Sequence, residues 1–178
     1  MWTAEKMAAE KTAAGAEMPA EIAPDLVTTI LDLAHHDVLP RGACIEALRL
    51  VQERYGWICD RHLRQIGDLL GMSPADLDGV ATYYNLIFRK PVGRNVIMLC
   101  DSVSCWLTGA DGVKEKLCAK LGIGMGQTTP DGAFTLLPIV CLGHCDHGPA
   151  MMIGAETYGP VKPEDIDAII EAKRGMTS

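Results

Sequence analysis

The sequence has 178 residues, of which 48% are hydrophobic and 22% are charged, and its 16 basic and 23 acidic side chains give a net charge of −7. This length and apolar content predict one domain, or a small domain with an appendage, and exclude an intrinsically disordered chain. The acidic balance, without clusters of Lys and Arg, argues against nucleic-acid binding and against a basic membrane-surface helix. The longest uncharged run, residues 132–145, is shorter than the ~20 residues of a spanning helix, and charged residues interrupt the N-terminus, so we expect neither direct membrane insertion nor export.

The N-terminal half of the chain has helical patterns. Residues 1–23 are rich in Ala, Glu and Lys with few large aliphatic side chains, which predicts a flexible N-terminal arm. Over residues 24–90, apolar side chains recur at helical spacing in four successive segments. Gly71 stands where the third helix needs a left-handed C-terminal cap, and Ser73 can cap the N-terminus of the fourth. Four short helices in succession predict a small helical bundle.

The pattern changes over residues 91–178. Val96–Cys100 is a continuous apolar run of strand length, which fits a strand buried on both faces. A helical stripe follows, and then a second strand over Phe134–Cys141, in which Pro138 indicates an edge position or a bend. A short third strand over Ala150–Ile153 and a last helix complete the chain. The order strand, helix, strand, strand, helix predicts an α/β layer, so the fold class expected of the whole chain is mixed, α+β or α/β.

The sequence contains seven cysteines, an odd number that argues against a disulfide framework in a chain without an export signal. Three stand alone and are expected to be small apolar fillers: Cys44, Cys59 and Cys118. The other four form a first pair, Cys100 and Cys105, and a second pair, Cys141 and Cys145. Each pair begins at the carboxyl end of a predicted strand, where ligands collect in open α/β sheets. Four thiolates therefore converge if the two strands are neighbours.

Three interpretations of the paired cysteines compete: a structural zinc ion, an iron–sulfur cluster, or four unrelated thiols. Zinc bound by four cysteines usually has pairs close to Cys-x2-Cys, so the Cys-x4-Cys and Cys-x3-Cys spacings fit it only loosely. Ligation of [2Fe–2S] fits better, since a plant-type ferredoxin also opens with Cys-x4-Cys and each pair can hold one iron. Gly143 and Gly148 would let backbone N–H groups approach the sulfur atoms. The spacing favours an electron carrier and leaves a zinc-stapled interaction module as the alternative of a different class.

The residues around the cysteines also carry a family resemblance. The segments concerned are CDSVSC (100–105), GQTTPDG (126–132) and CLGHCDHGP (141–149), with EALRLVQERYGW (46–57), GVATYY (79–84) and FRKPVGR (88–94) in the helical half. Together they resemble the E-type subunit of bacterial NADH:quinone oxidoreductase, which is the thioredoxin-like [2Fe–2S] ferredoxin subunit of respiratory complex I. The resemblance covers about residues 25–173.

This resemblance implies that residues 91–178 form a thioredoxin-like ferredoxin domain with one [2Fe–2S] cluster, one iron being held by Cys100 and Cys105 and the other by Cys141 and Cys145. It implies an electron-transfer subunit of the oxidoreductase, with no substrate-binding active site of its own. The implied partners are the flavin- and NADH-binding subunit and a neighbouring iron–sulfur subunit. The implied location is the cytoplasmic, peripheral arm of a membrane-associated complex. The closest alternative is the equivalent diaphorase subunit of a soluble NAD-dependent formate dehydrogenase or NAD-reducing hydrogenase.

Other features are less specific. Gly122–Gly126 is glycine-rich, but it follows a predicted helix rather than joining a strand to a helix, so it is expected to end that helix and not to bind NADH. His144 and His147 either tune the cluster from beside it or lie in an exposed loop. Trp106 either shields the cluster from water or packs against the partner.

Overall fold

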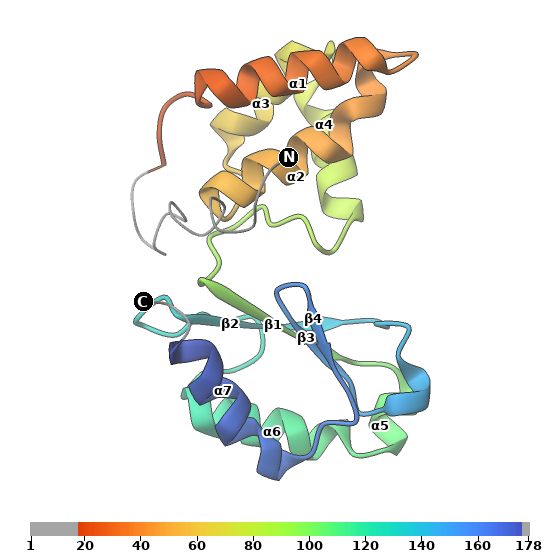
Figure 1. Cartoon of the computed structure of the whole chain (residues 1–178), viewed down its shortest axis with the longest axis vertical. Helices are drawn as coiled ribbons and strands as arrows, with labels where there is room; N and C mark the ends of the chain where they lie inside the picture. The colour runs from red at the N-terminus through yellow and green to blue at the C-terminus, as the bar shows by residue number, and fades with distance from the viewer. Residues whose placement is uncertain (1–17, 176–178) are drawn as a thin grey trace. The chain divides into compact units, whose positions relative to one another are not determined.

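The computed structural model describes residues 18–175, and the chain divides into two compact units, Met1–Pro91 and Val92–Ser178 (Figure 1). The first unit is helical, and the second combines a four-stranded sheet with helices. Each unit encloses its own cluster of buried apolar side chains. The mixed fold class predicted from the sequence is confirmed. Within the described residues, no helix combines the length and apolar character needed to cross a membrane.

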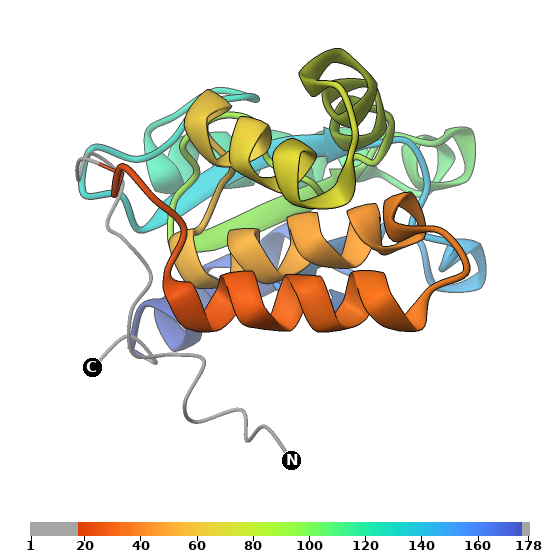
Figure 2. The ribbon, with the colours of Figure 1, turned by 90° about the horizontal axis from the view of Figure 1, so that it is seen from above.

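The described part of the first unit contains four α-helices and one short 3₁₀ helix: α1 (Pro24–His36), η2 (Pro40–Ala43), α2 (Cys44–Tyr55), α3 (Asp60–Leu70) and α4 (Pro74–Tyr83). Helices α1 and α2 lie side by side, and α3 contacts α1, α2 and α4 (Figure 2). Each α-helix contributes a fully buried aliphatic side chain to the shared core: Ile30, Leu48, Ile66 and Leu77. The bundle therefore forms through the apolar faces that the helical spacing indicated.

Local signals fix the ends of α3 and α4. Gly71, the residue after α3, has a φ of 64°, in the left-handed region that costs other residues about 1–2 kcal/mol. The Oγ of Ser73 accepts a hydrogen bond of 3.1 Å from the N–H of Asp76, which satisfies a free donor in the first turn of α4. Both caps lie where the sequence predicted them.

Arg89 fastens the segment that follows α4 to the bundle. Its guanidinium donates hydrogen bonds to the carboxylates of Asp78, at 2.7 Å, and Asp60, at 2.6 Å, and to the carbonyl oxygen of Ile58. Burial alone would lower the pKa of Arg89, but the hydrogen bonds to the two carboxylates outweigh it and raise the pKa. This one side chain thus ties the segment after the bundle to the start of α3 and to the middle of α4.

The arm expected over residues 1–23 lies mostly outside the described residues, but its last part is packed. Ile22 is buried in the first core, and its N–H donates to Oε1 of Gln65 at 2.9 Å. The N–H of Ala23 donates to the hydroxyl of Tyr55 at 2.9 Å. The packed structure therefore begins before the expected boundary at residue 24. The reason is that side chains 32 and 43 positions further along the chain satisfy these backbone groups.

The second unit contains four strands, β1 (Asn95–Cys100), β2 (Phe134–Ile139), β3 (Met151–Ile153) and β4 (Glu156–Tyr158), and the helices α5 (Val103–Leu107), α6 (Ala110–Leu121), η3 (Cys145–His147), η4 (Pro163–Asp165) and α7 (Ile166–Gly175) over its described residues. The strand order is β2-β1-β3-β4. Strands β1 and β2 are parallel, whereas β3 runs antiparallel to β1 and β4. Helices α6 and α7 lie on the same side of the sheet and close the second core over it (Figure 1).

Two details of the sheet differ from the sequence prediction. Strand β2 ends at Ile139 rather than at Cys141, since the pairing of this edge strand with β1 stops at Ile139, one residue after Pro138. Strand β4 was not predicted. Its three residues pair with β3 through the backbone, and the turn between the two strands depends on Gly154, whose φ is 61°.

Candidate metal centre

The two cysteine pairs converge at one edge of the sheet. Cys100 is the last residue of β1, and Cys105 lies in α5 just after it. Cys141 follows β2 by two residues, and Cys145 opens η3. Because β1 and β2 are parallel neighbours, with Cys100 opposite Ile139, both pairs leave the sheet at the same edge. The two strands that carry the pairs are therefore neighbours, as convergence requires.

Sulfur contacts connect the cysteines. The Sγ atoms of Cys141 and Cys145 lie 3.7 Å apart. Two thiolates on one tetrahedral metal, with bonds of about 2.3 Å, lie about 3.8 Å apart, so the second pair already has the spacing of two ligands of one ion. The thiol of Cys100 approaches the carbonyl oxygen of Val140, the residue before Cys141, at 4.0 Å. The first pair thus faces the loop that carries the second.

The spread of the sulfur atoms differs from the spacing that a single metal ion requires. Over residues 18–175, three or more His, Cys, Asp or Glu ligand atoms lie within 4.8 Å of one another in a single group, and that group contains none of the cysteines. A mononuclear zinc site needs all four sulfur atoms about 3.8 Å from one another. No three of the four sulfur atoms, all of which belong to described residues, lie within 4.8 Å of one another, so the thiols are not gathered around a single point.

The two pairs differ in their surroundings. Cys100 and Cys105 are 2% and 1% exposed, whereas Cys141 and Cys145 are exposed. Burial, with a hydrogen bond to Cys100, raises the pKa of Cys105. A hydrogen bond from the N–H of Gly143 lowers the pKa of Cys141, and the neighbouring Cys141 sulfur raises the pKa of Cys145. The chain itself therefore stabilises Cys141 as a thiolate.

Glycines allow the backbone to approach these sulfur atoms. Gly143 has a φ of 74°, and its N–H donates to Sγ of Cys141 at 3.3 Å. A Cβ at Gly148 would lie 2.8 Å from Oγ1 of Thr108 and 3.5 Å from Sγ of Cys105. The loop after the second pair therefore packs directly on α5. The donor set and this close packing fit a thiolate-ligated cluster.

Exposed apolar side chains accompany the cysteines on α5 and just after β2: Val103, Trp106, Leu107 and Val140. Trp106 is 59% exposed, yet it also lines a small cavity together with Cys100. This geometry is compatible with both roles expected of Trp106, which are shielding the cysteine site from water and contacting a partner. The exposure of the other three residues was not predictable from the sequence, because isolated apolar positions give no signal of it.

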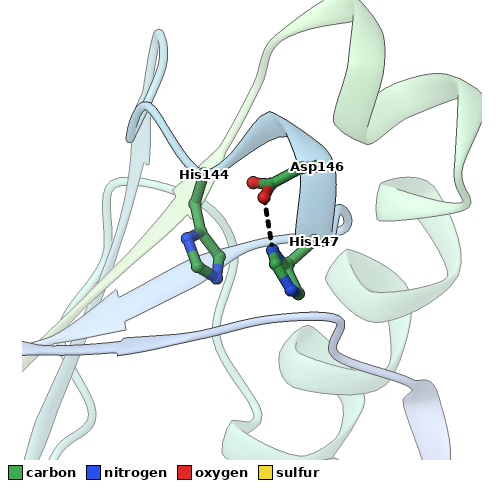
Figure 3. A group of neighbouring side chains, drawn as sticks. All are labelled: His144, Asp146 and His147. Atoms are coloured by element: carbon green, nitrogen blue, oxygen red, sulfur yellow. Dashed lines mark ion pairs between the residues drawn. The ribbon is translucent and has the colours of Figure 1, made fainter.

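His144 and His147 lie in the loop that carries Cys145. Their rings stack with centroids 4.7 Å apart, and Oδ2 of Asp146 lies 3.0 Å from Nδ1 of His147 (Figure 3). His144 is half-buried and His147 is exposed. Sequence reasoning missed Asp146, since nothing in the order Cys-Asp-His indicates that the carboxylate turns to its neighbour.

The remaining cysteines and the glycine-rich run have structural roles. Cys44 is buried in the first core, and Cys118 packs beside the second. Cys59 caps α3, because its sulfur accepts a hydrogen bond of 3.5 Å from the N–H of His62. Gly122 ends α6 with a φ of 67°, so Gly122–Gly126 is the helix-ending loop that was predicted.

Comparison with known proteins gives the family. Residues 30–174 match the family described as thioredoxin-like [2Fe–2S] ferredoxin. The E-type subunit of the NADH-quinone oxidoreductase of Pseudomonas aeruginosa is 49% identical over 138 residues, which is 78% of this chain and 83% of that protein. The corresponding E-type subunit of Escherichia coli K12 is 51% identical over 137 residues, 77% of this chain and 82% of that protein.

Among solved structures, an NAD+-reducing [NiFe]-hydrogenase in the air-oxidized state superposes with a TM-score of 0.67 at 24% identity. The match covers 76% of this chain but spans only 23% of the hydrogenase chain, so it shows a shared fold. The E-type subunits, in contrast, match over most of their own length. The resemblance seen in the sequence is thereby confirmed: this chain belongs to the thioredoxin-like [2Fe–2S] ferredoxin family, together with the E-type subunits of NADH-quinone oxidoreductase.

Proposed function

We propose that this chain is the electron-transfer subunit of an NADH:quinone oxidoreductase and that its two cysteine pairs hold one [2Fe–2S] cluster. The observation that carries the proposal is the arrangement of four thiols in two pairs at one edge of parallel β1 and β2, in a chain about half identical to the E-type subunits of that oxidoreductase. When bound, such a cluster takes up and releases single electrons. Cys100 and Cys105 would hold one iron, and Cys141 and Cys145 the other.

The chain's own groups act differently on the negative charge of the two cysteine pairs. The N–H of Gly143 directs a partial positive charge at Sγ of Cys141, while Cys100 and Cys105 are enclosed by protein. Hydrogen bonds to sulfur and exclusion of water are two means by which a protein sets the potential of such a centre. The exposed second pair is the side at which another redox group can come close, and we assign electron exchange to it.

The apolar surface formed by Val103, Trp106, Leu107 and Val140 supports a docking role for this side. All four side chains are more than half exposed. Aromatic side chains, Trp above all, are enriched at the centres of protein interfaces, where charged residues are depleted. We assign this surface to the flavin- and NADH-binding subunit, with an iron–sulfur subunit as a further neighbour, in the cytoplasmic peripheral arm of the complex.

We assign no substrate-binding active site to the chain. Four protein thiolates, together with the sulfides of the cluster, would complete the coordination of the two irons and leave no position for a substrate. The glycine-rich run after α6 caps a helix instead of opening one, so it lacks the strand-to-helix context of a dinucleotide site. NADH oxidation would then belong to the partner, and this chain would exchange electrons with it.

The proposal is tested on the purified full chain by iron, sulfide and zinc analysis, visible absorption, and EPR after reduction. The expected result is two irons and two sulfides per chain and an EPR signal on one-electron reduction. Cys145→Ala should abolish the visible spectrum, whereas the matched variant Cys118→Ala should retain it. A colourless protein that contains zinc, or an unchanged spectrum in Cys145→Ala, would refute the cluster or its ligand set. Purification of the native complex would identify the host by its neighbouring chains.

A further inference from the structure

Three side chains next to the cysteine site form a separate group of metal-binding donors. One donor atom each from His144, Asp146 and His147 lies within 4.8 Å of the other two (Figure 3). None of the three belongs to the sulfur ligand set proposed above. The group combines two imidazoles with one carboxylate, all on the η3 loop.

The backbone explains why the two rings meet. His144 is the N-cap of η3 and His147 is its last residue, and the N–H of His147 donates to the carbonyl oxygen of His144 at 3.1 Å. In a 3₁₀ turn, side chains three positions apart eclipse one another. The rings accordingly stack at 4.7 Å between centroids and 20° between planes. Their proximity is a property of the turn and not of a chance pair of surface rotamers.

A second segment of the unit supports His144 from the side. A Cβ placed on Gly159 would lie 2.7 Å from Cδ2 and 3.2 Å from Nε2 of His144, and it would also meet the carbonyl oxygen of His147. The backbone at Gly159, just after β4, therefore lies directly against the ring of His144. Only a glycine permits this approach, so the imidazole is held between the η3 loop and the segment after β4.

The distances suit a metal ion with nitrogen and oxygen ligands. Nδ1 of His147 and Oδ2 of Asp146 are 3.0 Å apart, close to the roughly 3.3 Å that separates two such ligands of a tetrahedral zinc with bonds of about 2.0–2.1 Å. Imidazole donors favour Zn²⁺, Ni²⁺ or Cu²⁺ over the oxygen-seeking Mg²⁺ and Ca²⁺. His147 and Asp146 are 52% and 75% exposed, so an ion could enter from solvent and complete its coordination with water.

We propose that His144, Asp146 and His147 form a second, exchangeable site for a divalent transition-metal ion, distinct from the cysteine site. An ion there would lie on the same loop as Cys145 and would be the largest local positive charge beside it. The site needs no residue of another chain, and none of its ligands is one of the four thiols.

The experiment uses the full chain with its cysteines intact and Zn²⁺ as the probe, followed by isothermal titration calorimetry. Wild type should bind one ion that His144→Gln and His147→Gln no longer bind. Asp146→Asn should lose most of the binding, because it replaces a charged oxygen ligand with a neutral amide. The control His36→Gln alters an exposed histidine on α1 and should bind as wild type does. Equal binding in wild type and in both histidine variants would overturn the proposal.

A second measurement needs no variant. Diethyl pyrocarbonate modifies accessible imidazoles, and peptide mass spectrometry reports each site. Bound Zn²⁺ should protect His144 and His147 and leave His36 reactive, whereas unprotected His144 and His147 would contradict the site. Visible and EPR spectra of the same samples report the cysteine site separately. A missing cluster with histidine-dependent Zn²⁺ binding would refute the proposed function and keep this inference, and the reverse result would do the opposite.

Discussion

The backbone N–H of Gly143 donates a hydrogen bond to Sγ of Cys141, with nitrogen and sulfur 3.3 Å apart. The contact depends on a φ of 74° at Gly143, which other residues adopt at a cost of about 1–2 kcal/mol. It lowers the pKa of Cys141 and so favours the thiolate, the form that binds metal. A backbone donor thus prepares one ligand of the proposed cluster.

Gly143→Ala should therefore make the reduction potential of the cluster more negative. The strained alanine would move the N–H away from sulfur, and a weaker hydrogen bond stabilises the reduced, more negative centre less. We expect the free energy of unfolding to fall by about 1 kcal/mol as well. An EPR-monitored redox titration measures the potential.

The matched control for this change is Gly154→Ala. Gly154 has a φ of 61° and lies in the turn between β3 and β4, so an alanine there would be similarly strained without affecting a contact to sulfur. The reduction potential of the cluster in Gly154→Ala should equal that of wild type. If Gly143→Ala also keeps the wild-type potential, the hydrogen bond has no influence on the centre.

Trp106→Ala should weaken binding to the flavin-bearing subunit while the cluster stays intact. Exposed Trp side chains at interface centres contribute at least about 2 kcal/mol, or about 30-fold in Kd. Surface plasmon resonance with the purified partner measures the affinity, and the visible spectrum confirms the cluster. Thr157→Ala, at an exposed position of β4, should bind normally. Unchanged affinity in Trp106→Ala would place the interface elsewhere.

The burial of His62 predicts that the helical bundle loses stability at acidic pH. Its ring is fully buried, Nε2–H donates to the carbonyl oxygen of Pro19 at 3.0 Å, and burial lowers its pKa below the usual 6.5. Because the pKa of His62 is lower in the folded state than in the unfolded state, protons bind the unfolded state preferentially. The stabilisation that the neutral, buried ring contributes is therefore fully present above pH 6.5 and is lost as the pH falls through the folded-state pKa. Urea unfolding at pH 7.5 and pH 5 should show this loss in wild type.

His62→Gln should be less stable than wild type at pH 7.5, by about 1–3 kcal/mol, because it disturbs a buried hydrogen bond. It should also lose less stability between pH 7.5 and pH 5, since the titrating ring is gone. His36→Gln, in which an exposed histidine is replaced, should keep the wild-type dependence. Equal pH dependence in His62→Gln and wild type would show that another group is responsible.

Arg89→Ala should destabilise the first unit by about 1–3 kcal/mol, because it leaves the carbonyl of Ile58 and two carboxylates without their shared donor. Arg89→Lys should recover only part of this lost stability, since an ammonium lacks the planar fork of a guanidinium.

Arg49→Ala is the control for this prediction. Arg49 pairs with Glu46 and Glu53 on the exposed face of α2, and exposed pairs of this kind contribute about 0.2–1 kcal/mol. Chemical unfolding followed by circular dichroism compares the three variants, and equal losses at Arg89 and Arg49 would disprove the fastening role.

What the sequence could predict follows from the range over which each signal acts. Gly71 and Ser73 act on neighbouring residues, so the ends of α3 and α4 were readable from the chain. The position of each cysteine pair at a strand end was also predictable, because strand ends and spacing are local, whereas the convergence of the pairs depended on β1 and β2 being neighbours. The pinning of Ile22 by Gln65, 43 positions away, and the backbone pairing of β4 were not, since no side-chain pattern encodes the partner.

The family resemblance supplied what spacing left open. Cys-x4-Cys and Cys-x3-Cys admitted zinc as well as iron–sulfur, and the flanking motifs identified the family before the fold was known. Neither the cysteine spacing nor the family resemblance predicted the conformation of the η3 loop. The pairing of Asp146 with His147 and the close approach of Gly159 to His144 depend on a turn and on a segment after β4 that no motif describes.

The unequal burial of the two cysteine pairs bears on how reagents reach the site. Cys100 and Cys105 are enclosed by packed structure, whereas Cys141 and Cys145 lie on one short exposed loop outside the sheet. Water-soluble thiol reagents therefore have direct access to the second pair, while the first pair becomes accessible only when the surrounding structure opens. Chemical damage to the proposed centre is accordingly expected to begin at the second pair.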